Sequence, residues 1–237
     1  MADDIDVDAP APARFGYLTS LATVLLTVIT FTVALMTPPL SGPFCAAASC
    51  YEYPYTDILS RFPRDYYYMF PTIVWCLLFV AMMAAIHQFA SRARKYFSLV
   101  ALSFAVMGAT ILVANYFLQL SVIQPSLAAG ETEGIALISQ YNPHGVFITL
   151  DEIGYLLIAL SMGSAAPVFS GNTWPERIVR WAFALAPIVA LVGLLIVAFA
   201  YGISREYIFE VMVITIVWLA LIVGGSALTM VFRSAHA

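Results

Sequence analysis

Two adjacent carboxylates stand inside a stretch of sequence that otherwise reads as a membrane helix. The segment NPHGVFITLDEIGYLL, residues 142–157, places Asp151 and Glu152 among apolar residues, with His144 shortly before them. Ionisable side chains within a membrane span are costly, and they usually face the bundle interior or a water-filled cavity. A carboxyl group at that depth is expected to pair with a cation or to carry a proton. The segment therefore indicates a polar site near one end of a membrane helix.

Helical spacing gives these side chains different directions. Residues three, four and seven apart share a helix face, so His144, Asp151 and Tyr155 form one stripe. Asp151 and Glu152 point about 100° apart, so only one of them can face the bundle axis squarely. We favour Asp151 because its stripe carries the other polar side chains, whereas Glu152 is expected to reach a neighbouring helix or the membrane interface. The candidate cationic partners are Arg61, Arg64 and Arg205.

Other polar side chains are predicted at the same depth. Asn115 and Gln119 share a face near the end of another apolar segment, and Glu206 and Glu210 are four residues apart at the start of the last one. The alternative to a ligand or proton site is a structural network that ties the helices together. The candidate ligand- or proton-binding residues are Asp151, Glu152, Asn115, Gln119, Tyr155, His144 and Glu210.

Metal and cofactor sites are not expected. His144 with two carboxylates would be a reasonable ligand set for a hard or borderline cation, but the remaining histidines, His87 and His236, fall on the opposite side of the membrane. A haem between helices would need pairs of histidines within the spans, and the sequence has none. We therefore predict no metal and no cofactor.

The elements that must position these residues are membrane helices. The chain has 237 residues, of which 62% are hydrophobic and 10% are charged, whereas a soluble domain carries about 25% charged residues. A hydrocarbon core takes roughly 20 apolar residues per helix, and backbone polar groups in lipid must be satisfied internally. The prediction is an all-α, six-helix transmembrane domain over residues 15–233, after an acidic tail, residues 1–14, that we expect to be disordered. The predicted helices are residues 15–36, 69–89, 97–120, 146–169, 178–200 and 207–232.

Basic residues orient this bundle. With six spans, seven of the ten Lys and Arg residues fall on one side of the membrane, and this side is expected to be cytoplasmic. Both termini are then cytoplasmic, and two long loops, residues 37–68 and 121–145, lie outside. The first helix is expected to be retained, because its apolar stretch is longer than the roughly 7–15 residues of a signal-peptide core. The predicted location is the plasma membrane.

The two loop cysteines are predicted to form a disulfide. Cys45 and Cys50 lie five residues apart in the first outer loop, and the outer side is oxidising in most cells. A metal or redox pair is the weaker alternative, because the spacing is not C-x-x-C. Cys76 lies within the second helix and is expected to act as a small buried hydrophobe.

Three functions remain compatible with the sequence. The composition offers no basic surface for nucleic acid, and no H-E-x-x-H, G-x-S-x-G or Walker motif occurs. We favour a protein that binds, and transports or senses, a small organic or lipophilic ligand, with proton coupling at Asp151. The first alternative is a membrane enzyme in which Asp151 and Glu152 act as acid and base on a lipid or isoprenoid. The second is an accessory or assembly subunit. Membrane lipids are the expected partners, and assembly with a second copy or with a partner subunit stays open.

Overall fold

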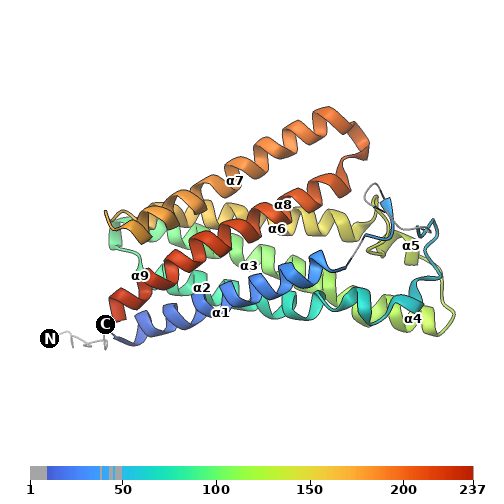
Figure 1. Cartoon of the computed structure of the whole chain (residues 1–237), viewed down its shortest axis with the longest axis horizontal. Helices are drawn as coiled ribbons and strands as arrows, with labels where there is room; N and C mark the ends of the chain where they lie inside the picture. Colours follow the sequence, from blue (N-terminus) through green and yellow to red (C-terminus); the bar gives the residue numbers. More distant parts are fainter. Residues whose placement is uncertain (1–9, 38, 43–44, 46–49, 237) are drawn as a thin grey trace.

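Six long helices run side by side through the part of the chain that the structure describes (Figure 1). The computed structural model describes residues 10–37, 39–42, 45 and 50–236, so residues 1–9 of the predicted disordered tail lie outside it. All six helices are long and apolar enough to cross a membrane, and no strand occurs within the described residues. The predicted all-α class, with six helices of membrane-spanning length, is confirmed for the described residues.

The long helices of the six spans have the following bounds. The first four long helices are α1 (Pro10–Leu35), α2 (Met69–Phe89), α3 (Lys95–Leu118) and α6 (Val146–Ala165). The fifth is α7 (Trp174–Tyr201), and the sixth joins α8 (Glu206–Ala220), the π turn η8 (Leu221–Gly225) and α9 (Ser226–His236). Short helical segments complete the described chain: η2 (Ile58–Arg61), η3 (Arg64–Tyr66), η4 (Arg92–Arg94), α5 (Ile135–Ile138), η6 (Ala166–Val168) and η7 (Gly202–Ser204).

The third span is longer than the sequence predicts. It continues from α3 through the π turn η5 (Gln119–Ile123) into α4 (Gln124–Ala128), beyond the predicted end at residue 120. Pro125 follows the π turn directly. A proline clashes with the carbonyl one turn before it, and a locally widened turn relieves that clash without ending the helix. The helix therefore passes through a proline that the sequence prediction places in a loop.

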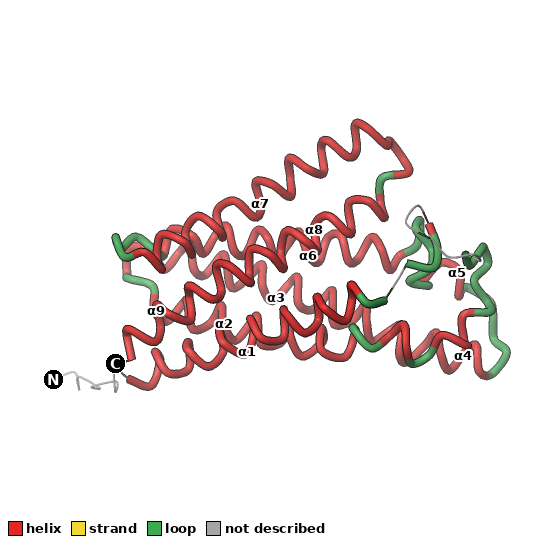
Figure 2. Tube along the Cα trace, in the orientation of Figure 1, coloured by secondary structure: helices red, strands yellow, loops and turns green. Residues whose placement is uncertain are grey.

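The connecting segments gather at the two ends of the bundle (Figure 2). One end, called here the terminal end, holds the start of α1, the end of α9 and the connections α2–α3 and α6–α7. The other, called the loop end, holds η2, η3, α4, α5 and the connection α7–α8. The two segments predicted as long outer loops thus lie at one end of the molecule.

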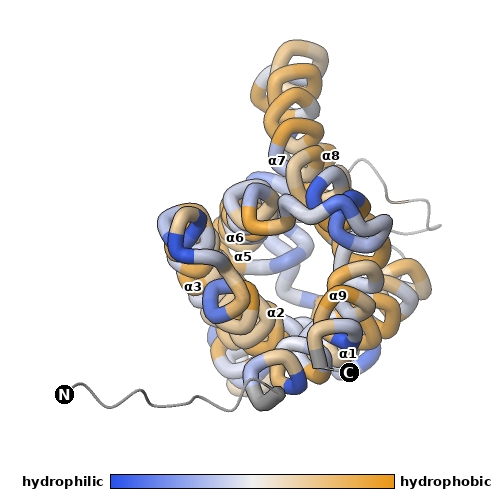
Figure 3. Tube along the Cα trace, turned by 90° about the vertical axis from the view of Figure 1, so that its left-hand side faces the viewer, coloured by the Kyte–Doolittle hydropathy of each residue, from blue (hydrophilic) through white to orange (hydrophobic). Residues whose placement is uncertain are grey.

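Five of the spans form a closed ring, and α7 lies outside it. Contacts run from α1 to α2, to α3, to α6, to α8 and, through η8 and α9, back to α1. The helix α7 packs on α6, α8 and α9 and leans away from the ring, as the view along the bundle shows (Figure 3). Near the loop end, Phe199 of α7 is 99% exposed, and Ile203 of η7, which follows α7 directly, is 89% exposed. Lipid is the expected neighbour of such a face.

Small residues bring the first and sixth spans together at the terminal end. A Cβ atom on Gly16 would lie 2.6 Å from the Phe232 ring, and one on Gly225 would lie 2.7 Å from Val24. Small residues at such positions let membrane helices approach closely. Toward the loop end the contact is instead between large rings, with Phe31 and Trp218 5.2 Å apart. The two spans therefore lie close at one end and are held apart at the other.

Small residues and buried hydroxyl groups also join α6 to α3. A Cβ atom on Gly154 would lie 2.6 Å from Leu112, and one on Gly108 would lie 2.9 Å from the Gly154 carbonyl oxygen. Ser161 Oγ donates to the Ala101 carbonyl at 2.7 Å. This close contact fixes the height of α6 against α3, and with it the position of the carboxylates on α6.

The predictions about the cysteines agree with the structure. The predicted disulfide between Cys45 and Cys50 is present, with an S–S distance of 2.02 Å, and Cys76 is a free, buried cysteine. Trp174 and Trp181 lie on α7 with 65% and 61% of their surface exposed. Both belong to the part of α7 nearer the terminal end.

Candidate functional site

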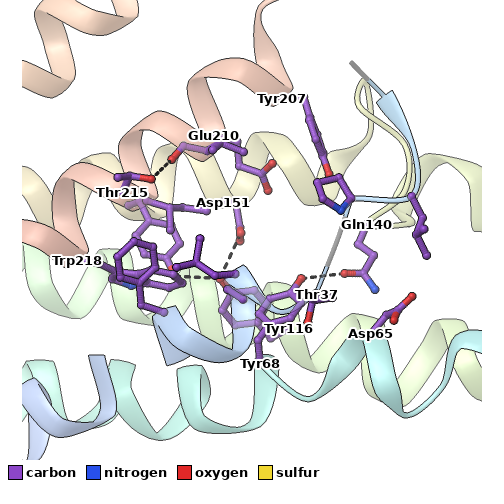
Figure 4. A pocket seen from close by; sticks show the side chains of 18 of the residues that line it. Thr37, Asp65, Tyr68, Tyr116, Gln140, Asp151, Tyr207, Glu210, Thr215 and Trp218 are labelled. Carbon is purple, nitrogen blue, oxygen red and sulfur yellow. Dashed lines mark hydrogen bonds between the residues drawn. The ribbon is translucent and has the colours of Figure 1, made fainter. Parts of the chain in front are cut away.

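A pocket of about 300 Å³ opens where the first and sixth spans separate. It lies toward the loop end between α1, α6 and α8, and the loop segments complete its wall (Figure 4). The lining residues that carry polar atoms or aromatic rings are Phe31, Thr37, Asp65, Tyr68, Tyr116, Gln140, Tyr141, Asp151, Tyr155, Tyr207, Glu210, Thr215 and Trp218. This volume lies at the lower end of the range of small-molecule pockets, roughly 300–1,000 Å³.

Asp151 reaches the pocket from α6 and is held by α3. Asn115 Nδ2 donates to Asp151 Oδ1 at 2.8 Å and to the Phe147 carbonyl at 2.9 Å. The Tyr116 hydroxyl donates to Asp151 Oδ2 at 3.2 Å. Asp151 is only 2% exposed, and no ion pair to it is found among the described residues. Its carboxylate is therefore stabilised by neutral donors rather than by a cation.

Aromatic rings form much of the wall around this carboxylate. Tyr155 lies one turn below Asp151, and its hydroxyl is 3.3 Å from that of Tyr116. The Tyr155 ring stacks on Trp75 at 6.0 Å and meets Trp218 edge-on at 6.0 Å. Trp75 is held in turn by α1, because its Nε1 donates to Thr27 Oγ1 at 2.8 Å. The rings are thus fixed from both sides of the pocket.

Glu210 enters the same pocket from α8. Its side chain is 7% exposed and points into the pocket beside Asp151 (Figure 4). Tyr207, Ile214 and Trp218 lie three, four and eight residues from it and share its helix face. Within the described part of the chain, no hydrogen bond or ion pair reaches the Glu210 carboxylate. The side chain of Glu206, predicted one turn away, lies outside the described residues.

Glu152 points away from this pocket and pairs with an arginine. Arg205 Nη1 lies 3.0 Å from Glu152 Oε2, and Glu152 is not among the residues that line the pocket. The ion pair ties α6 to the start of α8. Asp151 and Glu152 are therefore not brought together around one cavity, and the acid–base pair that the enzyme alternative requires has no geometric support.

Two further predicted residues lie outside the pocket. Gln119 is buried, but its Nε2 donates to the Ile138 carbonyl at 2.6 Å and its Oε1 accepts from the Gln140 amide at 3.0 Å. It therefore holds the segment after α5 against the π turn of the third span. His144 is exposed and precedes α6, which begins at Val146. It is not part of the α6 stripe to which the sequence assigned it.

A third carboxylate, Asp65, lines the pocket on the loop side. Its carboxylate lies 3.9 Å from Arg61 Nε and 3.3 Å from Arg64 Nε, and it accepts from the Tyr141 hydroxyl at 3.1 Å. Burial raises the pKa of Tyr141, with smaller contributions from Tyr66 and from the negative charge of Asp65. Tyr141 therefore stays a hydrogen-bond donor to Asp65 at any ordinary pH.

Sequence reasoning did not single out several lining residues. Spacing could have found the α8 face, since Tyr207, Glu210, Ile214 and Trp218 recur at helical intervals. Helical spacing does not identify Asp65 and Gln140, because both reach the pocket from short segments outside the long helices. Tyr68 directly precedes α2, and its hydroxyl donates to Gln140 Oε1 at 2.8 Å. The polar or aromatic lining residues that the sequence analysis does not propose as ligand-binding are Phe31, Thr37, Asp65, Tyr68, Tyr116, Gln140, Tyr141, Tyr207, Thr215 and Trp218.

The arrangement offers negative charge, hydroxyl groups and aromatic faces in one confined space. Among the described residues, no group of three His, Cys, Asp or Glu side chains is placed to hold a metal ion. The pocket can therefore provide counter-charge, hydrogen bonds and ring contacts to an organic molecule. Comparison with known proteins finds no matching family model, no matching curated protein and no matching solved structure.

Proposed function

We propose that this chain is a plasma-membrane protein whose pocket binds, and transports or senses, a small organic or lipophilic ligand. The loop end faces outward in this proposal, and both termini are cytoplasmic. The observation that carries it is the pocket itself: Asp151 and Glu210 enter a cavity of about 300 Å³ among aromatic side chains, inside a bundle whose buried residues are mostly apolar. Concave, mostly apolar cavities with a few convergent polar groups are the usual form of ligand sites.

Proton coupling at Asp151 follows from the way this residue is held. Its partners are the neutral donors Asn115 and Tyr116, so the charge of its carboxylate is not matched by an arginine or a lysine. A buried carboxylate in that position is stabilised when it takes up a proton or a cation. Ligand binding would then change with pH in the wild type, and this dependence should disappear in Asp151→Asn.

The first experiment is mass spectrometry of the small molecules and lipids that co-purify with the gently solubilised protein. Wild type and Asp151→Asn are compared, with Ser161→Ala as a control that loses an α3–α6 hydrogen bond far from the pocket. A molecule depleted at least about tenfold in Asp151→Asn alone supports the proposal, since loss of one buried charged partner costs more than a tenfold change in affinity. Equal recovery from all three proteins contradicts it.

An accessory-subunit function has its own supporting observation. The polar contacts Asn115–Asp151 and Arg205–Glu152 tie α6 to α3 and to α8, as structural ties in an assembly subunit would. In that case Asp151→Asn lowers stability, no small molecule is lost, and a partner membrane protein co-purifies. The same mass-spectrometric comparison therefore separates the two functions.

A further inference from the structure

Four buried carboxylates lie around the loop end, and two of them are balanced by arginine. Asp65 has Arg61 and Arg64 beside it. Glu152 pairs with Arg205 at 3.0 Å. These three arginines lie at the loop end, and their positive charges offset the negative charges of Asp65 and Glu152. Asp65 and Glu152 therefore do not need a positively charged group of a ligand to offset their charges.

The other two carboxylates, Asp151 and Glu210, have no cation of their own. Asp151 accepts hydrogen bonds from Asn115 and Tyr116, both of which are neutral. Glu210 is 93% buried, since its exposed fraction is 7%, and it has no hydrogen-bond or ion-pair partner in the described part of the chain. Burying an unpaired carboxylate is costly, so such a group normally has a partner or carries a proton. Both side chains are directed into the pocket (Figure 4).

The rest of the pocket wall is suited to the same kind of ligand. Its lining residues include no lysine, arginine or histidine. An anionic ligand would thus meet three lining carboxylates, Asp65, Asp151 and Glu210, and no lining cationic side chain. The faces of tyrosine and tryptophan rings attract cations, and the attraction grows when water is excluded. Tyrosine or tryptophan rings line the pocket from α3, α6, α8 and the loop segments, and Phe31 adds a ring from α1. The aromatic lining residues are Phe31, Tyr68, Tyr116, Tyr141, Tyr155, Tyr207 and Trp218.

We infer that the ligand is a small organic cation, with an ammonium group between Asp151 and Glu210 and an apolar body against the aromatic rings. This inference rests on the proposed function of the pocket as a ligand site, and it names the ligand class. A bare metal ion fits less well, because the described residues contain no group of three metal-binding side chains. The volume of about 300 Å³ equals the space of about ten water molecules in the liquid, which suits one ring with a substituted ammonium group.

The experiment uses the full chain, purified in lipid nanodiscs, and measures equilibrium binding of tritiated benzyltrimethylammonium. Three unlabelled competitors are compared: benzylamine, neopentylbenzene and phenylacetate. Neopentylbenzene has the shape of the probe with carbon in place of the charged nitrogen, and phenylacetate carries the opposite charge. The expected result is saturable binding of the probe, displacement by benzylamine, and at least about a tenfold weaker effect of the neutral and anionic competitors.

Glu210→Gln is the decisive variant, and Glu131→Gln is its matched control, since Glu131 is exposed at the loop end. Glu210→Gln should weaken probe binding at least about tenfold, whereas Glu131→Gln should leave it unchanged. Because Glu210→Gln removes an unpartnered buried charge, the ligand-free variant should also melt at a higher temperature than wild type. This gain in stability shows that weakened binding does not come from misfolding.

The outcomes separate the ligand class from the proposed function. If neopentylbenzene competes as well as benzylamine, the pocket is a ligand site without charge selection, and the cation inference fails while the proposed function stands. Displacement of the probe by sodium or calcium ions at equal concentration would also overturn the inference, in favour of a metal-ion site. If neither ammonium compound binds and no small molecule co-purifies, both the inference and the proposed function fail.

Discussion

The side chain of Asn115 does more at the candidate site than its single hydrogen bond to Asp151. Its amide also donates to the Phe147 carbonyl, one turn earlier on α6. One buried amide thus binds both the carboxylate and the backbone of the helix that carries it. The bond to Asp151 orients the carboxylate toward the pocket, and the bond to Phe147 holds α6 against α3.

Replacing Asn115 by alanine should therefore reduce both stability and ligand binding. The loss of two hydrogen bonds, one of them to a carboxylate, should lower the free energy of unfolding by about 1–2 kcal/mol. Thermal melting of the detergent-solubilised protein measures this loss, and retention of the co-purifying ligand measures binding.

The control for Asn115→Ala is Ser161→Ala, which removes another bond between α6 and α3 at a distance from the pocket. It should lower stability slightly and leave ligand retention unchanged. A loss of ligand that is equal in both variants would mean that Asn115 acts only through general stability.

At the scale of the helices, the site depends on how closely α3 and α6 approach. Gly154 and Gly108 allow that approach, because a Cβ atom on Gly154 would lie 2.6 Å from Leu112. The contact lies one turn below Asp151 on α6. Its geometry therefore sets whether Asn115 and Tyr116 can reach the carboxylate.

Gly154→Leu should displace α6 from α3. Overpacking of a closely packed contact costs about 1–3 kcal/mol, and the displacement should also break the Asn115–Asp151 bond. A lower melting temperature together with lost ligand retention is the expected result.

Ile153→Leu provides the comparison for Gly154→Leu. Ile153 is the preceding residue and is 40% exposed on the outside of the bundle, so this variant should behave as wild type. A stable, ligand-binding Gly154→Leu protein would show that the α3–α6 contact does not position the site.

The helices themselves were largely predictable, whereas their departures from regularity were not. Continuous apolar stretches of the right length identify membrane helices without reference to their neighbours, which is why the start of α2 at Met69 and of α6 at Val146 agree with the sequence. The sequence predicts an end of the third helix at residue 120, and a proline at position 125 gives no sign that the span continues to Ala128. A π turn accommodates this proline, and no periodic pattern in the sequence predicts a π turn there.

At the scale of the whole molecule, the distribution of basic residues and the disulfide predict the orientation in the membrane. The positive-inside rule assigns the terminal end to the cytoplasm, and the disulfide between Cys45 and Cys50 belongs to the loop end. An oxidising environment at the loop end agrees with this assignment. The pocket would then be accessible from outside the cell.

Cysteine labelling in intact cells tests the orientation. Glu133→Cys places an exposed thiol at the loop end, and Asn172→Cys places one at the terminal end. A membrane-impermeant maleimide should label the first variant only, and permeabilised cells should allow labelling of both. The native background is low because Cys45 and Cys50 are bonded and Cys76 is buried. The opposite labelling pattern would reverse the topology.

Only some of the residues of the pocket could be identified from the sequence. Asp151, Tyr155 and Glu210 could be selected because charged and polar groups in apolar helices stand out against their neighbours. Gln119 and His144 could not be excluded, because their true contacts depend on the path of the segment before α6. Phe31 and Trp218 lie on two spans that are far apart in the sequence. Their place in the pocket wall depends on the distance between these spans, and only the folded ring of helices defines that distance.

The positions of the four tryptophans give the protein a built-in optical reporter. Trp218 lines the pocket and Trp75 stacks on Tyr155 beside it, and both are buried. Trp174 and Trp181 are exposed on α7 and do not line the pocket. A water-soluble collisional quencher such as iodide should therefore leave the emission of the buried pair largely intact. The remaining emission should shift when a ligand enters the pocket, so occupancy can be followed without any attached dye.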